Sequence, residues 1–174
     1  HQDAAANLSA TQQFLTFSLS GEMFGVGILT VKEIIEYGEV TEIPMVPAFI
    51  CGVINLRGAV VPVIDLAARF GNTPTIPSRR TCIIILEIRH EDSTQTLGVL
   101  VDSVSAVLDI PTSEIEPPPA FGARIRADFI VGMGKVDGHF VILLDIERVL
   151  SVDEIATLAS LGESDTSEAV SASL

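Results

Sequence analysis

Two aspartates stand where a carboxylate could do chemistry. Asp65 and Asp145 each end an apolar run, and each precedes five residues that could begin a short helix. Paired carboxylates serve general acid–base catalysis, so a small hydrolase that uses acidic pairs is one interpretation. In the other interpretation, each aspartate accepts hydrogen bonds from the first N–H groups of a helix. We favour two helix caps over a catalytic pair.

The remaining reactive side chains do not form a catalytic or metal-binding motif in the sequence. His1, His90 and His139 are scattered, and neither Cys51 nor Cys82 has a second ligand at metal-binding spacing. Both cysteines lie in apolar runs. We therefore expect two buried free thiols in a reducing compartment, and no metal.

Two further fragments match catalytic or cofactor motifs only in part. Gly25-Val26-Gly27 begins like a dinucleotide-binding loop, but Thr30 stands where the third glycine is needed. Asp102-Ser103 begins like an aspartic-protease turn, but Val104 takes the place of its glycine. The sequence also has no Gly-x-Ser-x-Gly element and no basic phosphate cradle. We therefore expect a protein without enzymatic activity and without a cofactor.

The composition argues against nucleic acids and membranes as partners. The 174 residues carry a net charge of −13, which repels phosphate backbones and anionic lipids. Hydrophobic residues make up 48% of the chain, but no uninterrupted apolar run is long enough to span a bilayer. Residues 1–12 lack the hydrophobic segment of a signal peptide. We expect a cytoplasmic protein in which residues 1–12 and the acidic tail, residues 162–174, are disordered.

The strongest pattern in the chain is an internal repeat. Six residues return 80 positions later: Phe49, Ile50, Gly52, Gly58, Val61 and Asp65 recur as Phe129, Ile130, Gly132, Gly138, Val141 and Asp145. Upstream, the offset is 73, because Gly25, Val26, Val31 and Pro44 recur as Gly98, Val99, Val104 and Pro117. The offset changes only in turn-like or proline-rich stretches, where insertions are tolerated. This favours a structural duplication over coincidence in a composition rich in Val, Ile and Gly.

Short β-rich runs separated by turn signals predict five strands in each repeat. The expected strands are 13–19, 23–28, 31–37, 52–56 and 60–64, then 82–88, 96–101, 104–110, 132–136 and 139–144. Pro62 lacks an N–H group, so we expect it on an edge strand or at a bulge. The predicted fold is all-β: two five-stranded SH3-like barrels from an internal duplication, with short helices and a C-terminal helix.

The repeat also predicts the domain organisation. We expect a first barrel over residues 13–72, a second over 80–150, and a helix over 151–161 that opens with a capping box of Ser151 and Glu154. Halves this small are marginally stable alone, so a third apolar layer should join them. Whether strands exchange between the barrels stays open. The repeated glycines are expected at structural turns: Gly52, Gly58, Gly132 and Gly138.

Two charges are not kept in the repeat. Arg57 corresponds to Asp137, and Glu33 corresponds to Ala106. Because both charges are flanked by aliphatic residues, one hypothesis joins them in a partly buried ion pair that shapes a recognition surface. The alternative, two unrelated solvated charges, is equally open.

The segment around Arg57 resembles the CheW family of bacterial chemotaxis coupling proteins. The resemblance rests on the run from Ile43 through Asn55-Leu56-Arg57-Gly58 to Leu66, on Val31-Lys32-Glu33-Ile34-Ile35 ahead of it, and on residues 98–104 and 143–146. It covers about residues 13 to 161. It implies two five-stranded SH3-like barrels and a non-catalytic adaptor. Such an adaptor couples methyl-accepting chemoreceptors to the CheA histidine kinase in a chemosensory signalling array.

The resemblance also implies partners and sites. Receptor contacts are expected at Val31, Glu33, Asn55, Arg57 and Val99, with Val99 lining a groove between the barrels. The regulatory domain of CheA, which has the same architecture, is expected at the barrel ends. The alternatives are a CheW-like module from a larger signalling protein (CheV-like or a kinase regulatory domain) and, more distantly, the acidic-pair hydrolase. The stretch 117–127 and the acidic tail depart from the family pattern and leave open a pathway other than swimming chemotaxis.

Overall fold

The structure is a computed structural model of the chain. It describes residues 10–90, 92–118, 127–151, 154, 156–158 and 160–161. The segment expected to be disordered at 162–174, most of the one at 1–12, and most of the 117–127 stretch lie outside the described residues. The part that is described is mainly β-structure, with short helices, as the sequence predicts. No helix in that part is long and apolar enough to cross a membrane.

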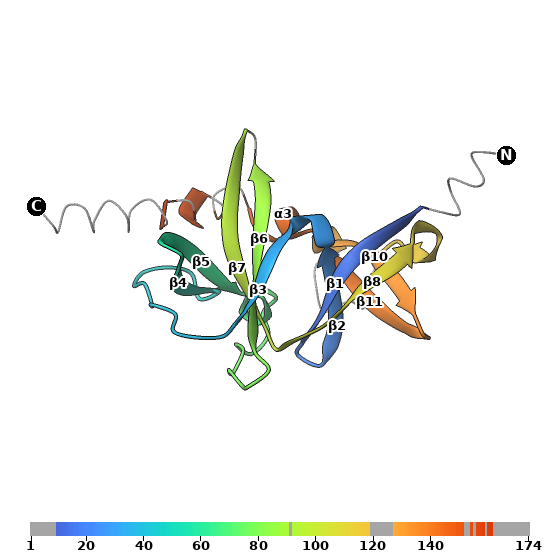
Figure 1. Cartoon of the computed structure of the whole chain (residues 1–174), viewed down its shortest axis with the longest axis horizontal. Coiled ribbons are helices and arrows are strands. Elements are labelled where there is room, and N and C mark those ends of the chain that lie inside the picture. Colours follow the sequence, from blue (N-terminus) through green and yellow to red (C-terminus); the bar gives the residue numbers. More distant parts are fainter. Residues whose placement is uncertain are drawn as a thin grey trace, which may run out of the picture.

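The strands form two sheets (Figure 1). The first sheet, here called module A, has the order β8-β1-β2-β11-β10-β9. Its strands are β1 (Thr11–Leu19), β2 (Glu22–Gly27), β8 (Ser103–Pro111), β9 (Ile115–Glu116), β10 (Ile130–Val136) and β11 (His139–Leu144). The second sheet, module B, has the order β3-β6-β7-β5-β4. Its strands are β3 (Val31–Glu36), β4 (Ile50–Leu56), β5 (Ala59–Asp65), β6 (Cys82–His90) and β7 (Ser93–Val101).

Short helices connect or follow these strands. The 3₁₀ turns are η1 (Ile28–Thr30), η2 (Thr112–Glu114) and η3 (Ala127–Phe129), and the α-helical turns are α2 (Leu66–Arg69) and α3 (Ile146–Val149). Beyond α3, the described residues from Glu154 to Leu161 are helical. Within that segment Leu158 is fully buried, so the C-terminal helix packs on the body of the protein.

The two modules are copies of one arrangement, but they do not follow the two halves of the sequence. By the repeat offsets, β1 to β5 correspond to β6, β7, β8, β10 and β11. Applied to module B, this correspondence turns β3-β6-β7-β5-β4 into β8-β1-β2-β11-β10, which is the order in module A. Leaving aside the two-residue strand β9, each module therefore takes two strands from one repeat and three from the other. The boundaries expected at 13–72 and 80–150 do not separate the modules.

Strand pairing explains this exchange. The β1–β2 hairpin pairs antiparallel with β8 and parallel with β11, both from the second repeat. In the same way, the β6–β7 hairpin pairs with β3 and with β5, both from the first repeat. The linker between β2 and β3 consists only of η1, so the chain passes directly from module A into module B.

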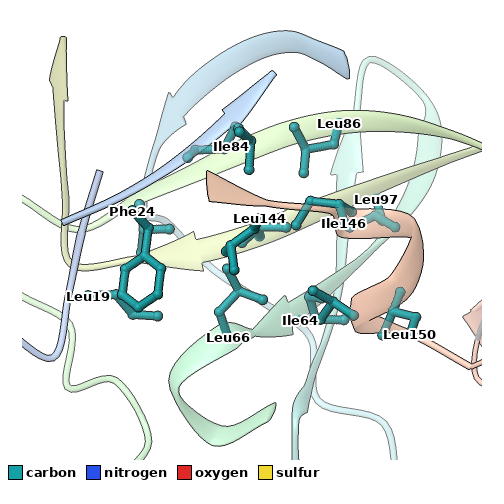
Figure 2. Close-up of a cluster of buried hydrophobic side chains, with 14 of the residues drawn as sticks. Leu19, Phe24, Ile64, Leu66, Ile84, Leu86, Leu97, Leu144, Ile146 and Leu150 are labelled. Carbon is teal, nitrogen blue, oxygen red and sulfur yellow. The ribbon is translucent and has the colours of Figure 1, made fainter. Parts of the chain in front are cut away.

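The buried apolar residues form three clusters, one inside each module and one between the modules. The interior of module A contains Phe14, Ile110, Val141 and Leu143, and that of module B contains Ile54, Val61, Val63, Ile83, Ile85 and Leu100. The third and largest cluster draws residues from both modules, including Phe24, Leu144, Ile64 and Ile84 (Figure 2). This is the apolar layer expected between the halves. The modules form one body, because burial in this layer removes apolar surface of both from water.

Strand β6 contains an uninterrupted apolar run from Ile83 to Leu86 because both of its faces are buried. Ile83 and Ile85 face the interior of module B, whereas Ile84 and Leu86 face the layer between the modules. A strand that is buried on both faces does not alternate between apolar and polar residues.

Two of the glycines expected at turns lie elsewhere. Gly52 and Gly132 sit within β4 and β10, each at an irregularity in its pairing with the next strand. A Cβ on Gly52 would overlap the carbonyl of Thr41, and Gly52 has a φ of +148°. A Cβ on Gly132 would meet the backbone oxygen of Glu116 at 2.9 Å. These glycines therefore do not form a turn. The lack of a side chain lets the backbone of Thr41 approach Gly52, and that of Glu116 approach Gly132.

Pro62 also differs from expectation, because β5 is an inner strand of module B. Its partner Val53 exchanges both backbone hydrogen bonds with Thr41, which lies on the other side of β4. The nitrogen of Pro62 therefore points away from β4, towards β7. Pairing with β7 begins only at Val63, so no ladder bond is lost at Pro62.

Candidate functional site

The aspartates that could have served catalysis are engaged in structure. Asp65 is 5% exposed and is the N-cap of α2. Its carboxylate accepts hydrogen bonds from the N–H groups of Ala67 and Ala68, and from both the N–H and the hydroxyl of Thr75. A carboxylate with its oxygens occupied in this way is not poised to accept a proton from a substrate.

Asp145 has the same place in the second repeat. It is the N-cap of α3, where it accepts from the N–H of Glu147 at 3.2 Å and pairs with Arg148 at 3.4 Å. Ser151 and Glu154 form a reciprocal capping box, since Ser151 N donates to Glu154 at 2.6 Å and Glu154 N donates to the Ser151 hydroxyl at 3.1 Å. These side chains satisfy helix N–H groups.

Asp102 lines a described cavity that the two helix-cap aspartates do not share. Asp102 accepts a hydrogen bond from Ser20 N in the β1–β2 turn and lines a shallow cavity of about 290 Å³. Neither Asp65 nor Asp145 lines that cavity. Across the described ranges, no three His, Cys, Asp or Glu side chains gather in a way that could hold a metal ion.

The most distinctive polar contact on the surface is the ion pair of Arg57 and Glu33. Arg57 Nη1 donates to Glu33 Oε2 and Nη2 donates to Oε1, both at 2.7 Å. The Glu33 side chain is 26% exposed and that of Arg57 is 72% exposed. Of the two interpretations left open by the broken repeat, the structure shows the ion pair, but only its carboxylate is partly shielded. The hydrogen bonds between the two side chains shift the pKa of both groups. They lower the pKa of Glu33 and raise the pKa of Arg57, because they favour the charged form of each.

The β4–β5 hairpin aims Arg57 at Glu33. Leu56 and Ala59 are the last paired residues, and the loop between them is Arg57-Gly58, with φ angles of 52° and 87°. Two central residues with positive φ define a type I′ turn, whose twist matches that of the strands it joins. The side chain of Asn55 braces the turn by accepting a hydrogen bond from Gly58 N at 2.9 Å. Asn55 is thus close to Arg57 and helps to fix its direction.

The corresponding turn in module A has the same backbone with different chemistry. Asp137 and Gly138 have φ angles of 49° and 79° between the paired residues Val136 and His139. The scaffold is therefore shared by the two modules, and the arginine–glutamate pair is specific to module B.

Strand β3 carries the other expected contact residues and is an edge strand of module B. Val31 and Glu33 are both partly buried on this strand. Val99, in contrast, is 1% exposed and belongs to the apolar layer between the modules. Its burial removes Val99 from the surface residues, because a fully packed side chain cannot contact a partner without local unfolding.

Two apolar residues of this region were not selected from the sequence. Ile34 is 42% exposed and Tyr37 is 38% exposed, on or just after β3. Lys32, Ile34 and Glu36 are alternate residues of β3 and therefore share one face of the strand. The two charged neighbours on that face could have indicated from the sequence that Ile34 is exposed. Its repeat counterpart Val107 is also exposed, at 49%.

The comparisons with known proteins agree with this fold. Residues 13–154 match a family model described as a CheW-like domain. The chemotaxis protein CheW of Klebsiella aerogenes is 37% identical over 153 residues, 88% of this chain and 90% of that protein. Protein FrzA of Myxococcus xanthus is 29% identical over 84% of this chain and 89% of that protein. The crystal structure of the scaffolding protein CheW of Thermoanaerobacter tengcongensis superposes with a TM-score of 0.74, at 36% identity, and covers 83% of this chain and 91% of that one.

Proposed function

Because the chain belongs to the CheW family, we propose that it is a non-catalytic adaptor that couples chemoreceptors to the CheA histidine kinase. The family match spans both modules. A relative described as a scaffolding protein has the same fold. No observation favours the excised signalling module or the acidic-pair hydrolase over this role.

The proposed receptor contact is a surface at one end of module B, made of Val31, Glu33, Asn55 and Arg57. The observation that carries it is the exposed, two-bonded ion pair. Holding an arginine and a carboxylate in one geometry contributes little to the stability of an exposed site. An ordered pair of this kind does offer a partner helix a fixed pattern of charge beside aliphatic side chains.

The family match supports a proposal for the partners. We propose that the cytoplasmic tip of a methyl-accepting chemoreceptor lies against the Glu33–Arg57 surface. The regulatory domain of CheA, which has the same architecture, would dock at the ends of the modules that do not carry the Glu33–Arg57 surface. An adaptor of this kind acts by geometry: it raises the effective concentration of kinase near receptor and holds the two in register. It would therefore work in the cytoplasm beside membrane-bound receptor arrays.

Co-sedimentation with receptor signalling fragments and with CheA, each alone and then together, tests this role. Arg57→Asp should weaken receptor binding by roughly tenfold or more, because it places a second acid against Glu33. Binding to the kinase alone should not change. Lys32→Asp is the matched control, since it makes the same charge change on β3, at a residue paired with Glu87 and not with Glu33. Receptor binding by Arg57→Asp equal to that of the unchanged protein would refute the receptor surface.

A further inference from the structure

Arg69, the last residue of α2, contacts both modules and the C-terminal helix with one side chain. Its Nε donates to the carbonyl oxygen of Val149 at 2.9 Å, and its Nη2 donates to Glu154 at 3.1 Å. The guanidinium carbon also lies 5.2 Å from the ring centroids of both Phe49 and Phe129. The arginine side chain is only 20% exposed, so these contacts are largely shielded from water.

The repeat correspondence exchanges the two modules, as a two-fold axis would, and the contacts of Arg69 join residues that correspond under it. Val149 is the repeat counterpart of Arg69, and Phe129 is the counterpart of Phe49, both at the offset of 80. In a two-fold arrangement, a residue can touch its own counterpart only at the axis. The equal distances from the guanidinium to the two rings have the same origin.

The position on the axis explains why the repeat is broken here. Arginines at both 69 and 149 would bring two like charges to one poorly solvated place. The sequence keeps one arginine and gives its counterpart a valine that is fully buried. Arg69 was not selected from the sequence, although the change from Arg to Val within a repeated segment was the available signal.

The elements that Arg69 joins belong to different parts of the fold. Phe49 precedes β4 of module B, whereas Phe129 and Val149 flank β10 and β11 of module A. Glu154 lies in the C-terminal helix and forms a capping box with Ser151. The apolar layer between the modules attracts without direction. The hydrogen bonds and cation–π contacts of Arg69, in contrast, require one particular arrangement.

We propose that Arg69 is a positioning residue that sets the orientation of module A relative to module B and seats the C-terminal helix on both. The consequence for assembly rests on the proposed adaptor role: surfaces on the two modules are in register only when this orientation is fixed. The orientation itself can be measured without any partner, so the two ideas can be tested separately.

Arg69→Met is the primary variant, because it keeps an unbranched apolar stem and removes the charge and the donors. Arg69→Lys keeps the charge but loses the planar fork. Arg148→Met is the matched control, since it removes an arginine from α3 whose side chain is 70% exposed and pairs only locally with Asp145. Glu154→Gln removes the ionic contact to the C-terminal helix and leaves the two ring contacts in place.

The first readout is the distance between spin labels on the two modules, measured by double electron–electron resonance. Labels at Gln12→Cys and Thr94→Cys, both exposed, report on modules A and B in a background of Cys51→Ala and Cys82→Ser. We expect one narrow distribution for the parent and for Arg148→Met, and a shifted or broadened one for Arg69→Met. Amide exchange in residues 154–161 should accelerate in both Arg69→Met and Glu154→Gln. A distance distribution of Arg69→Met identical to that of the parent overturns the proposal.

The second readout separates positioning from simple destabilisation. Arg69→Met should bind receptor fragment alone and CheA alone within about twofold of the parent, yet activate the kinase at least about fivefold less when all three are combined. Equal loss of both binary affinities would instead indicate unfolding and overturn the positioning role. Should Arg69→Met fail to fold, Arg69→Lys carries the same two readouts. Failure of the parent protein to bind either partner would refute the adaptor role and leave the distance measurement unaffected.

Discussion

Arg57, at the tip of the β4–β5 hairpin, donates hydrogen bonds of 2.7 Å to both carboxylate oxygens of Glu33 on the edge strand β3. Only the planar fork of an arginine makes two parallel bonds to one carboxylate. The pair joins β3 to the β4–β5 hairpin, which lie at opposite ends of the strand order in module B. Its geometry is therefore a property of the folded module and not of either segment alone.

Replacing Arg57 with Asp should leave the fold intact. The position needs a positive φ, and Asp137 already occupies the equivalent position of module A with a φ of 49°. We expect the Tm of Arg57→Asp to stay within roughly 2 °C of the parent, because exposed ion pairs contribute little to stability. Arg57→Val should lower the Tm further, since a β-branched residue is strained at positive φ. Thermal denaturation followed by circular dichroism compares the two; a larger loss for Asp than for Val would contradict this interpretation of the turn.

The ion pair should respond to acid in a defined direction. The pKa of Glu33 is lower in the folded protein than its ordinary value of 4.5, chiefly because Arg57 donates hydrogen bonds to the carboxylate. A depressed carboxylate pKa stabilises the folded state above the ordinary value, and this stabilisation is lost as the pH falls through the lower, folded-state pKa. NMR titration of the Glu33 carboxyl carbon should show the shift. In Arg57→Ala the midpoint should return towards 4.5; an unchanged midpoint would show that Arg57 is not the cause.

Gly52 should tolerate no side chain. Its φ is +148°, and a Cβ there would overlap the carbonyl of Thr41. We expect Gly52→Ala to lower the free energy of unfolding by roughly 2–4 kcal/mol, because neither backbone segment can move cheaply. Gly27→Ala is the control, since Gly27 has a φ of −57° and no atom lies within 4 Å of the place its Cβ would take. Urea denaturation measures both, and equal effects would contradict the close approach of Thr41.

The two helix caps should differ in strength. Asp65 is buried and accepts four hydrogen bonds, two of them from Thr75, whereas Asp145 accepts one from Glu147 N. We expect Asp65→Ala to cost roughly 2–4 kcal/mol and Asp145→Ala roughly 0.5–1 kcal/mol in free energy of unfolding. Chemical denaturation of the two variants tests the difference. A larger loss for Asp145→Ala would show that the number of accepted hydrogen bonds does not set the strength of these caps.

Cys51 should be unreactive in the folded protein. Burial raises the pKa of its thiol to about 12, so very little thiolate exists near neutral pH. Alkylation by iodoacetamide at pH 8, followed by peptide mass spectrometry, should modify Cys51 slowly in buffer and rapidly in urea. Rapid modification in buffer would show that the thiol is not shielded as the structure indicates. Both cysteines are free, as the sequence predicts, and both are half-buried.

The sequence predicted most strands because burial leaves a periodic trace in it. The sequence did not predict the short strand β9, and it placed the start of β1 at residue 13 rather than at Thr11. It also missed the far end of the β6–β7 hairpin, which continues through Arg89↔Thr94 to His90↔Ser93, beyond the predicted ends at Ile88 and Thr96 (Figure 1). These residues are polar. A two-stranded ribbon outside the core carries no apolar alternation, so pattern alone could not extend the strands.

The exchange of strands could not be predicted for a different reason. Residues of β1 and β6 have the same apolar pattern, so each would fit either module, and only the short η1 linker decides which module the chain enters. Val99 came from the family resemblance and not from the repeat: the resemblance put it at a groove, and the structure buries it between the modules. The Glu33–Arg57 pair could be suggested from the sequence, because neither charge has a counterpart of the same charge in the repeat.

The passage of β1–β2 into the module of the second repeat makes each half of the chain depend on the other. The first hairpin pairs with β8 and β11, and the β6–β7 hairpin pairs with β3 and β5. A separated half would lack the strands that its hairpin pairs with in the intact chain. We therefore expect the two modules to unfold together, as one cooperative unit.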